Sequence, residues 1–198
     1  MKAPTTSSEF DQAYNAPMTV WGDVRIAPEL RELAEQHPGA SVLELGCGVG
    51  RFTRYMAQQG LCATGVDFSA VAIAKAEKQR ARDEEKLAYG AVTAKFMVGD
   101  VTDLSALTAS ANKYDIGFDI GCFHCLNARG QLDYVAQLAQ LLKPGATHLV
   151  WALNTAPSGL MLTPEKISDA FLPAFDMQNS RPSSRRWVGS HWYWLVRR

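Results

Sequence analysis

The chain has 198 residues, in which 20 lysines and arginines balance 20 aspartates and glutamates, so its formal net charge at pH 7 is zero. This balance provides no overall field that would recruit nucleic acid or an anionic membrane. No stretch approaches the about 18 uninterrupted apolar residues that a membrane helix needs, and residues 1–8 lack the apolar core of a signal peptide. Four cysteines are too few for a disulfide framework, so we expect reduced thiols and a cytoplasmic protein.

The N-terminal part changes from polar to amphipathic before the first expected strand. Residues 1–15 are polar and rich in turn formers, so we expect the first several to be disordered. Residues 28–36 have leucines at helical spacing, with Pro28 suited to a first turn and Pro38-Gly39 ending the helix. The first predicted helix therefore begins near residue 28.

From residue 41 onward, apolar runs of strand length alternate with helical patterns. Gly60 suits a left-handed helix end, and Ser69 suits a helix N-cap. The predicted strands are 41–45, 62–66, 95–98, 117–122, 147–153, 175–179 and 190–197. The further predicted helices are 50–59, 70–86, 104–111, 129–142 and 164–172. This alternation predicts an α/β fold with a doubly wound sheet and right-handed crossovers.

A glycine-rich turn follows the first expected strand. Val42-Leu43-Glu44-Leu45 runs into Gly46-Cys47-Gly48-Val49-Gly50-Arg51, and glycines so spaced let the backbone approach a ligand closely. The dinucleotide pattern G-x-G-x-x-G fails in both registers, because Arg51 and Thr53 stand where its last glycine belongs. No Gly-Lys pair followed by Ser or Thr occurs, so a phosphate loop is absent. The segment E-L-G-C-G-x-G-R instead resembles the first motif of class I S-adenosylmethionine-dependent methyltransferases.

Four further segments resemble this family in the expected order. Asp67 ends the second strand about 20 residues past the glycines, where a carboxylate suits hydrogen bonds to ribose hydroxyls. Met97-Val98-Gly99-Asp100-Val101-Thr102-Asp103 resembles the adenine-binding segment, which implies that Asp100 accepts from the adenine amino group and the Val101 backbone meets the ring edge. Residues 118–126 resemble the fourth strand and the loop facing the transferred methyl, and residues 141–146 resemble the turn before strand five. The resemblance covers about residues 38–153.

The resemblance implies a Rossmann-like, mostly parallel sheet of seven strands with a C-terminal antiparallel hairpin, and S-adenosyl-L-methionine as the methyl donor. It also implies one methyltransferase domain over residues 1–198, with an N-terminal lid and helix segment (1–37), a cofactor-binding core (38–153) and a C-terminal hairpin (154–198). We expect the cofactor in a crevice beyond the carboxyl ends of the strands. Its expected ligands are Trp21, Glu44, Gly46, Cys47, Gly48, Arg51, Asp67, Phe68, Asp100, Val101, Cys122 and Phe123.

Several of these residues have a second interpretation. Glu44 lies within a strand, where it either binds through water or orients the glycine loop. Trp21 and Tyr14 precede the first predicted helix and either cover the cofactor or pack the N-terminal segment onto the domain. Arg51 either pairs with an acid near the cofactor or faces solvent.

The expected substrate-binding residues are Tyr14, His124 and Asn127. His124 is the only histidine in the expected crevice loops, so it is the candidate catalytic base, and a hydrogen bond within its loop is the alternative. Cys122-Phe123-His124-Cys125 is formally C-x-x-C, but no second pair of suitable spacing completes a zinc site. We therefore expect no metal.

The length of the chain leaves little room for a nucleic-acid or protein recognition domain, which favours a small-molecule acceptor. The tetrapeptide N-P-P-[YF] of amide-nitrogen methylation is missing, and the overall pattern resembles small-molecule enzymes of the thiopurine and tellurite-resistance type. A tRNA, rRNA or protein methyltransferase and a non-catalytic cofactor-binding module stay as alternatives. A nicotinamide dehydrogenase is disfavoured by the glycine spacing. The acceptor atom (O, N or S) and the oligomeric state stay open.

Overall fold

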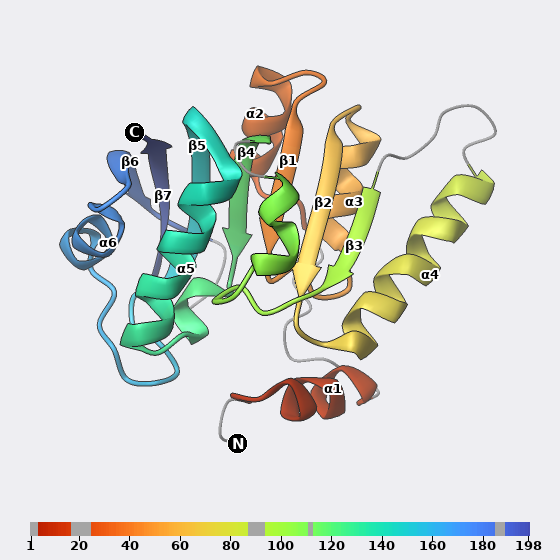
Figure 1. The fold of residues 1–198 in the computed structure, drawn as a ribbon, viewed down its shortest axis with the longest axis horizontal. Helices are drawn as coiled ribbons and strands as arrows, with labels where there is room; N and C mark the ends of the chain where they lie inside the picture. Colours follow the sequence, from red (N-terminus) through yellow and green to blue (C-terminus); the bar gives the residue numbers. More distant parts are fainter. Residues whose placement is uncertain (1–3, 17–24, 87–93, 111–112, 185–188) are drawn as a thin grey trace. The chain divides into compact units, whose positions relative to one another are not determined.

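The computed structural model describes residues 4–16, 25–86, 94–110, 113–184 and 189–198 (Figure 1). The chain forms two compact units, Met1–Gly99 and Asp100–Arg198. Its strands form a seven-stranded sheet in the order β3-β2-β1-β4-β5-β7-β6. This order confirms the predicted Rossmann-like sheet, whereas the predicted division into segments 1–37, 38–153 and 154–198 stays a prediction.

The first unit contains three parallel strands and four helices (Figure 1). Strand β1 pairs with β2, and β2 pairs with β3. Helix α1 lies at the end of β2 where α4 begins, and α3 connects β1 to β2. The bounds are α1 Ser7–Asn15, α2 Pro28–Gln36, β1 Ser41–Leu45, α3 Arg51–Gln58, β2 Cys62–Asp67, α4 Ala70–Lys86 and β3 Ala94–Val98.

The second unit contains a parallel strand pair that continues into an antiparallel hairpin. Strand β4 pairs with β5 in parallel, and β7 pairs antiparallel with both β5 and β6. This confirms the predicted C-terminal hairpin. The bounds are η1 Ser105–Ser110, β4 Tyr114–Ile120, η2 Phe123–Cys125, α5 Ala128–Leu141, β5 Leu142–Leu153, α6 Pro164–Phe171, β6 Phe175–Pro182 and β7 Ser190–Arg197.

Alternating and continuous apolar patterns account for most of these elements. The side chains of β1 after Ser41 are buried, and so are those of β2 after Cys62, as expected for parallel strands covered on both faces. Gly60 has a φ of +87° after α3, in agreement with the predicted left-handed helix end. Among the described residues, no helix combines the length and the apolar character that crossing a membrane requires.

Two local predictions are wrong, and a third is confirmed with a different type of helix. No helix was expected before residue 28, yet α1 is present because Thr6 and Glu9 form a capping box, in which each side chain accepts a hydrogen bond from the other residue's backbone. Strand β5 begins at Leu142 rather than at residue 147, since Leu142 already pairs with Tyr114. The predicted helix over 104–111 is a 3₁₀ helix, η1.

Gly50 tests how tightly the turn from β1 to α3 is packed. Its φ is +71°, and an added Cβ would meet the Phe96 ring and lie 2.8 Å from the Cβ of Ala76. We expect Gly50→Ala to lower the free energy of unfolding by about 1–3 kcal/mol for overpacking, in addition to about 1–2 kcal/mol for the left-handed backbone. Denaturant unfolding monitored by circular dichroism measures this loss.

The matched control is Gly145→Ala. Gly145 also has a positive φ, +80°, but nothing lies within 4 Å of its added Cβ. Gly145→Ala should therefore lower the free energy of unfolding only by the about 1–2 kcal/mol of the left-handed backbone. Equal losses for both variants would contradict the tight packing at Gly50.

Candidate functional site

The glycine loop between β1 and α3 is held by backbone hydrogen bonds. Gly46, Gly48 and Gly50 all have left-handed φ values, of +72°, +52° and +71°. The N–H groups of Gly46 and Cys47 both donate to the carbonyl of Val66, at 2.8 and 3.0 Å. The loop is thereby joined to the end of β2.

Asp67, the last residue of β2, holds two backbone segments at once. Its Oδ2 accepts from the N–H of Gly48 at 2.8 Å, and its Oδ1 accepts from the N–H of Ser69 at 2.9 Å. The Ser69 hydroxyl in turn accepts from the N–H of Ala72 at 3.0 Å, in the first turn of α4. Only 6% of Asp67 is exposed, and burial raises the pKa of its carboxyl above the ordinary value, while both N–H groups act to lower it.

Glu44 lies in β1 directly opposite Gly65 and is 2% exposed. The Thr53 hydroxyl of α3 donates a hydrogen bond to the Glu44 carboxylate. A Cβ on Gly65 would lie 2.6 Å from Thr53 Oγ1 and 2.9 Å from the Cβ of Cys47, so only glycine leaves room for this arrangement. This geometry connects β1 to α3 and suits orientation of the glycine loop.

Helix α1 packs against the glycine loop and the start of α4. The Tyr14 hydroxyl lies 2.7 Å from where a Cβ of Gly48 would be, and the Phe10 ring meets the Phe68 ring edge to face at 4.9 Å. Asp11 accepts hydrogen bonds from the Ser69 hydroxyl and from the N–H of Val71. The structure thus brings Tyr14 to the glycine loop, whereas Phe68, the residue after Asp67, packs against α1.

Of the remaining predicted residues in the first unit, Arg51 is half-buried at the first position of α3. The Cys47 thiol is buried, and burial raises its pKa well above the ordinary value, so it stays protonated. Trp21 lies outside the described residues.

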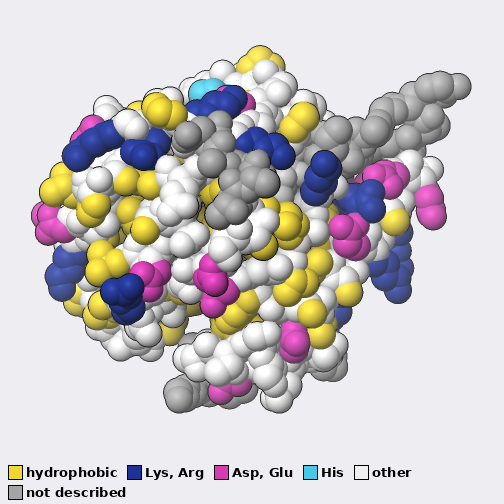
Figure 2. All heavy atoms as spheres, in the orientation of Figure 1, with side chains coloured by type: hydrophobic (Ala, Val, Ile, Leu, Met, Phe, Trp, Pro, Cys, Tyr) yellow, Lys and Arg dark blue, Asp and Glu magenta, His cyan; other side chains and the backbone are white. Residues whose placement is uncertain are grey.

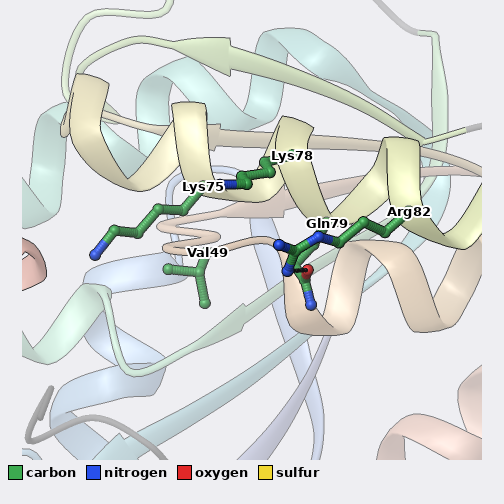
Figure 3. A pocket seen from close by; sticks show the side chains of 5 residues that line it. All are labelled: Val49, Lys75, Lys78, Gln79 and Arg82. Carbon is green, nitrogen blue, oxygen red and sulfur yellow. Dashed lines mark hydrogen bonds between the residues drawn. The ribbon is translucent and has the colours of Figure 1, made fainter. Parts of the chain in front are cut away.

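A groove of about 280 Å³ runs between the tip of the glycine loop and one face of α4 (Figure 3). It is lined by Val49, Lys75, Lys78, Gln79 and Arg82. Asp67 and Gly48 do not line it, and its three cationic side chains suit an anion rather than a sulfonium ion. We therefore place the candidate cofactor residues beside Asp67 rather than in this groove.

In the second unit, Asp100 forms a turn with the residues after it. Its Oδ1 accepts from the backbone N–H of Thr102 at 2.8 Å and from the Thr102 hydroxyl at 2.7 Å. The Asp100 side chain is exposed, whereas Val101 is buried. Such a turn leaves Oδ2 of Asp100 outside these two hydrogen bonds.

Asp119, near the end of β4, holds the loop that follows and was not predicted as a site residue. Its two carboxylate oxygens accept from the N–H groups of Cys122 and Phe123, each at 2.8 Å, and Oδ2 also accepts from the Tyr134 hydroxyl at 3.1 Å. Burial raises the pKa of Asp119 from 3.8 to about 7. Asp119 is the one charged residue of the predicted strand 117–122, and this is the available sequence signal.

The hydrogen bonds of Asp119 extend to a second buried group. The Tyr134 hydroxyl is 3.0 Å from Nε2 of His148, and both side chains are fully buried. Burial lowers the pKa of His148 from 6.5 to about 3, so the imidazole is neutral. A neutral ring can either donate to Tyr134 or accept from it, which lets the three groups stay hydrogen-bonded in both protonation states of Asp119.

The loop 121–127 contains His124, which is 6% exposed. Nδ1 of His124 accepts from the backbone N–H of Leu153 at 3.4 Å, and the ring meets Trp151 edge to face at 5.9 Å. An imidazole nitrogen that accepts carries no proton, so a neutral His124 has its proton on Nε2. The role of His124 as a catalytic base stays a prediction.

The other predicted residues of this loop have structural partners. The Asn127 side chain accepts from the N–H of Gly130 at 2.8 Å and caps α5. Phe123 is fully buried against Tyr134 and Phe171. Burial raises the pKa of Cys125 to about 12, and the described residues contain no group of three or more side chains that could hold a metal ion.

The raised pKa of Asp119 predicts a pH dependence of stability. Because the folded state binds this proton more tightly than the unfolded state, the stabilising contribution is present at low pH and is lost as pH rises from about 4 to about 7. Its full size is on the order of 4 kcal/mol. We expect the free energy of unfolding of wild type minus that of Asp119→Asn to fall over this range.

Denaturant unfolding of both proteins from pH 4 to pH 8 measures this difference. The contribution of His148 has the opposite sign, because its folded pKa is lowered, but it is present in both proteins and cancels. Parallel stability curves for the two proteins would contradict the raised pKa.

Comparison with known proteins identifies the family. Residues 42–145 match the family described as a methyltransferase domain. The chain is 26% identical over 175 residues to the 2-heptyl-1-hydroxyquinolin-4(1H)-one methyltransferase of Mycobacteroides abscessus, which covers 87% of this chain and 67% of that protein.

Two solved structures share the fold. The first is the 1,6-didemethyltoxoflavin-N1-methyltransferase of Burkholderia thailandensis, with a TM-score of 0.76, 19% identity and coverage of 100% of this chain and 93% of that one. The second is a TehB-like SAM-dependent methyltransferase of Corynebacterium glutamicum, with a TM-score of 0.70, 18% identity and coverage of 97% and 98%. Since the family match extends over more than half of the sequence, the chain belongs to the methyltransferase domain family and is an S-adenosylmethionine-dependent methyltransferase.

Proposed function

We propose that the protein transfers a methyl group from S-adenosylmethionine to a small-molecule acceptor, with Asp67 binding the ribose. The observation that carries the proposal is the position of the Asp67 carboxylate, which is hydrogen-bonded to Gly48 of the glycine loop and to Ser69 at the start of α4. A carboxylate has about four lone-pair positions, and two N–H groups use two of them. Two acceptor positions are left for two ribose hydroxyls.

The glycine loop also fits this cofactor. S-adenosylmethionine has no phosphate, so its site needs no set of N–H donors for an anion. It needs the protein backbone to come close to the ligand. The backbone of Gly46 and Gly48 is held at the end of β2, and the Tyr14 side chain lies beside Gly48. An aromatic ring near a sulfonium contributes roughly 0.5–2 kcal/mol of cation–π attraction.

We assign the remaining cofactor contacts to the second unit on the basis of the family resemblance. Asp100 and the Val101 backbone take the adenine, and the backbone of Cys122 and Phe123 takes the methionine end. The fixed geometry of both segments supports these roles, because Thr102 orients Asp100 and Asp119 holds Cys122 and Phe123.

Methyl transfer from a sulfonium is an in-line displacement at carbon. When bound, S-adenosylmethionine supplies the electrophilic methyl group. The protein contributes by aligning the acceptor atom with the carbon–sulfur bond and by excluding water. Buried carboxylates that fix the loops contribute to this alignment, because small displacements of a reacting atom are costly.

A small-molecule acceptor is supported by the relatives and by the distribution of charge. The similar proteins named above act on a hydroxyquinolone and on didemethyltoxoflavin. Figure 2 shows acidic and basic side chains interspersed on the face in view. We further propose a cytoplasmic location, which the four free cysteines support.

Replacement of Asp67 tests the cofactor site. Calorimetry should give a dissociation constant on the order of micromolar for S-adenosylhomocysteine with wild type, and Asp67→Ala should weaken binding at least about tenfold, or about 1.4 kcal/mol, because the ribose loses both acceptors. Asp169→Ala, an exposed carboxylate of α6, is the control and should bind like wild type. Unchanged affinity in a folded Asp67→Ala protein would refute the assignment.

The acceptor class is tested with methyl-labelled S-adenosylmethionine. Incubation with 2-heptyl-1-hydroxyquinolin-4(1H)-one and with a panel of phenols, thiols and heterocyclic amines should transfer label into an extractable small molecule. Incubation with bulk tRNA or a bacterial protein extract should leave the macromolecules unlabelled. Label in RNA or protein would establish one of the alternatives, and tight cofactor binding without any transfer would indicate a non-catalytic module.

A further inference from the structure

A second histidine, His191, lies at the end of the strands where an acceptor is expected. It is the second residue of β7 and pairs with Ala152, near the carboxyl end of β5. Ligands of open α/β sheets bind beyond the carboxyl ends of the parallel strands. His191 is half-buried, so its ring is held by the protein and is still reached by solvent.

Asn154 determines which nitrogen of His191 carries the proton. Nδ1 of His191 is 2.7 Å from Oδ1 of Asn154. An amide oxygen only accepts, so Nδ1 must be the donor and carry the proton. The lone pair of a neutral His191 is therefore on Nε2, and no described residue hydrogen-bonds this nitrogen.

The pair is held in place from both sides. The backbone N–H of Asn154 donates to the carbonyl of Gly189 at 2.9 Å, and the carbonyl of Asn154 accepts from the N–H of Leu162 at 2.7 Å. The His191 ring stacks on Tyr193 at 5.9 Å with 23° between the planes, and the Tyr193 hydroxyl donates to the carbonyl of Leu162. This support fixes both the tautomer and the orientation of the ring.

His124 has the opposite arrangement. Its Nδ1 accepts from the N–H of Leu153, the residue before Asn154, so its proton is on Nε2. Two histidines thus meet the end of β5 through consecutive residues. Nε2 carries the proton in a neutral His124 and is unprotonated in a neutral His191. A general base needs an unprotonated nitrogen whose lone pair can accept the proton.

We propose that His191, oriented by Asn154, is the base that removes the proton of the methyl acceptor. The inference rests on the proposed function and deepens it, because it restricts the acceptor to a group with an ionisable X–H bond, such as a phenol, an N-hydroxyl or a thiol. Nε2 of His191 takes the proton while the electron pair of X forms the bond to the methyl carbon and the carbon–sulfur electron pair returns to sulfur. The imidazolium then releases its proton to water.

The surroundings of the ring are compatible with this role. On the same face of β7, Tyr193 stacks on the His191 ring and Arg197 lies four residues beyond Tyr193; burial raises the pKa of Tyr193 to about 12, with Glu165 of α6 acting in the same direction. Tyr193 therefore stays neutral in the range where an imidazole titrates.

The first experiment reads the tautomers without any acceptor. Long-range ¹⁵N–¹H NMR of the imidazole rings in the full chain, bound to S-adenosylhomocysteine, should show His191 protonated on Nδ1 and His124 protonated on Nε2 above pH 7. Asn154→Ala should remove the preference at His191 and leave His124 unchanged. A His191 ring protonated on Nε2 in wild type would overturn the proposal.

The second experiment measures methyl transfer to 2-heptyl-1-hydroxyquinolin-4(1H)-one as the probe. His191→Gln should lower kcat about 10²- to 10⁴-fold, the range of general-base catalysis, with S-adenosylhomocysteine affinity within about twofold of wild type. Asn154→Asp should retain turnover and move the acidic limb of the pH–rate profile to higher pH, because a carboxylate partner stabilises the imidazolium. His37→Gln, at the end of α2, is the histidine control.

The outcomes separate this inference from the proposed function. Turnover by His191→Gln at the wild-type rate, with the same acidic limb, overturns the role of His191 and leaves the methyltransferase assignment intact. A wild type that binds S-adenosylhomocysteine but methylates none of the phenols, N-hydroxyl compounds or thiols in the panel refutes the acceptor class, and with it the base.

Discussion

The hydrogen bonds of the Asp67 carboxylate are the constraint on which the first unit depends. One oxygen holds Gly48 in the loop before α3, and the other holds Ser69 before α4, so a single side chain sets where both helices begin relative to β2. A buried N–H left without its acceptor costs about 1–3 kcal/mol, and here the loss would affect two of them. Burial raises the pKa of Asp67 and the N–H groups of Ser69 and Gly48 act against this rise, so the loops that Asp67 orders also favour its charged form.

The same construction recurs in the second unit. Asp100 holds the Thr102 backbone after β3, and Asp119 holds Cys122 and Phe123 after β4. Each acid lies near the end of a strand and accepts hydrogen bonds from the loop that follows it. Asp67 and Asp100, the two acids that the family resemblance assigns to the cofactor, therefore fix the loops beside them through hydrogen bonds within the protein. Such preorganisation reduces the entropy that binding must overcome.

The sequence predicts the regular part of this arrangement well, because hydrophobic patterns and glycines report on local structure. Helix α4 has the predicted bounds Ala70–Lys86, and strand β1 has the predicted bounds Ser41–Leu45. The predictions do not include helix α1, although Thr6 and Glu9 have capping-box spacing, because residues 1–15 are polar and lack an apolar helical pattern. The polar pairs could not be predicted, since Tyr134 and His148, or Asn154 and His191, meet only through strand pairing and helix packing. Chain spacing holds no signal for them.

The three histidines of the second unit show why residue type alone did not settle the chemistry. His124 lies beside the family motif, which made it the candidate base, but a backbone N–H uses its Nδ1. His148 is neutral and buried against Tyr134, which restricts it to the support of Asp119. His191 lies far from every motif along the chain, yet its partner is an amide oxygen, and this partner leaves Nε2 with a lone pair. The partner of an imidazole decides whether it gives or takes a proton, and only the folded chain determines that partner.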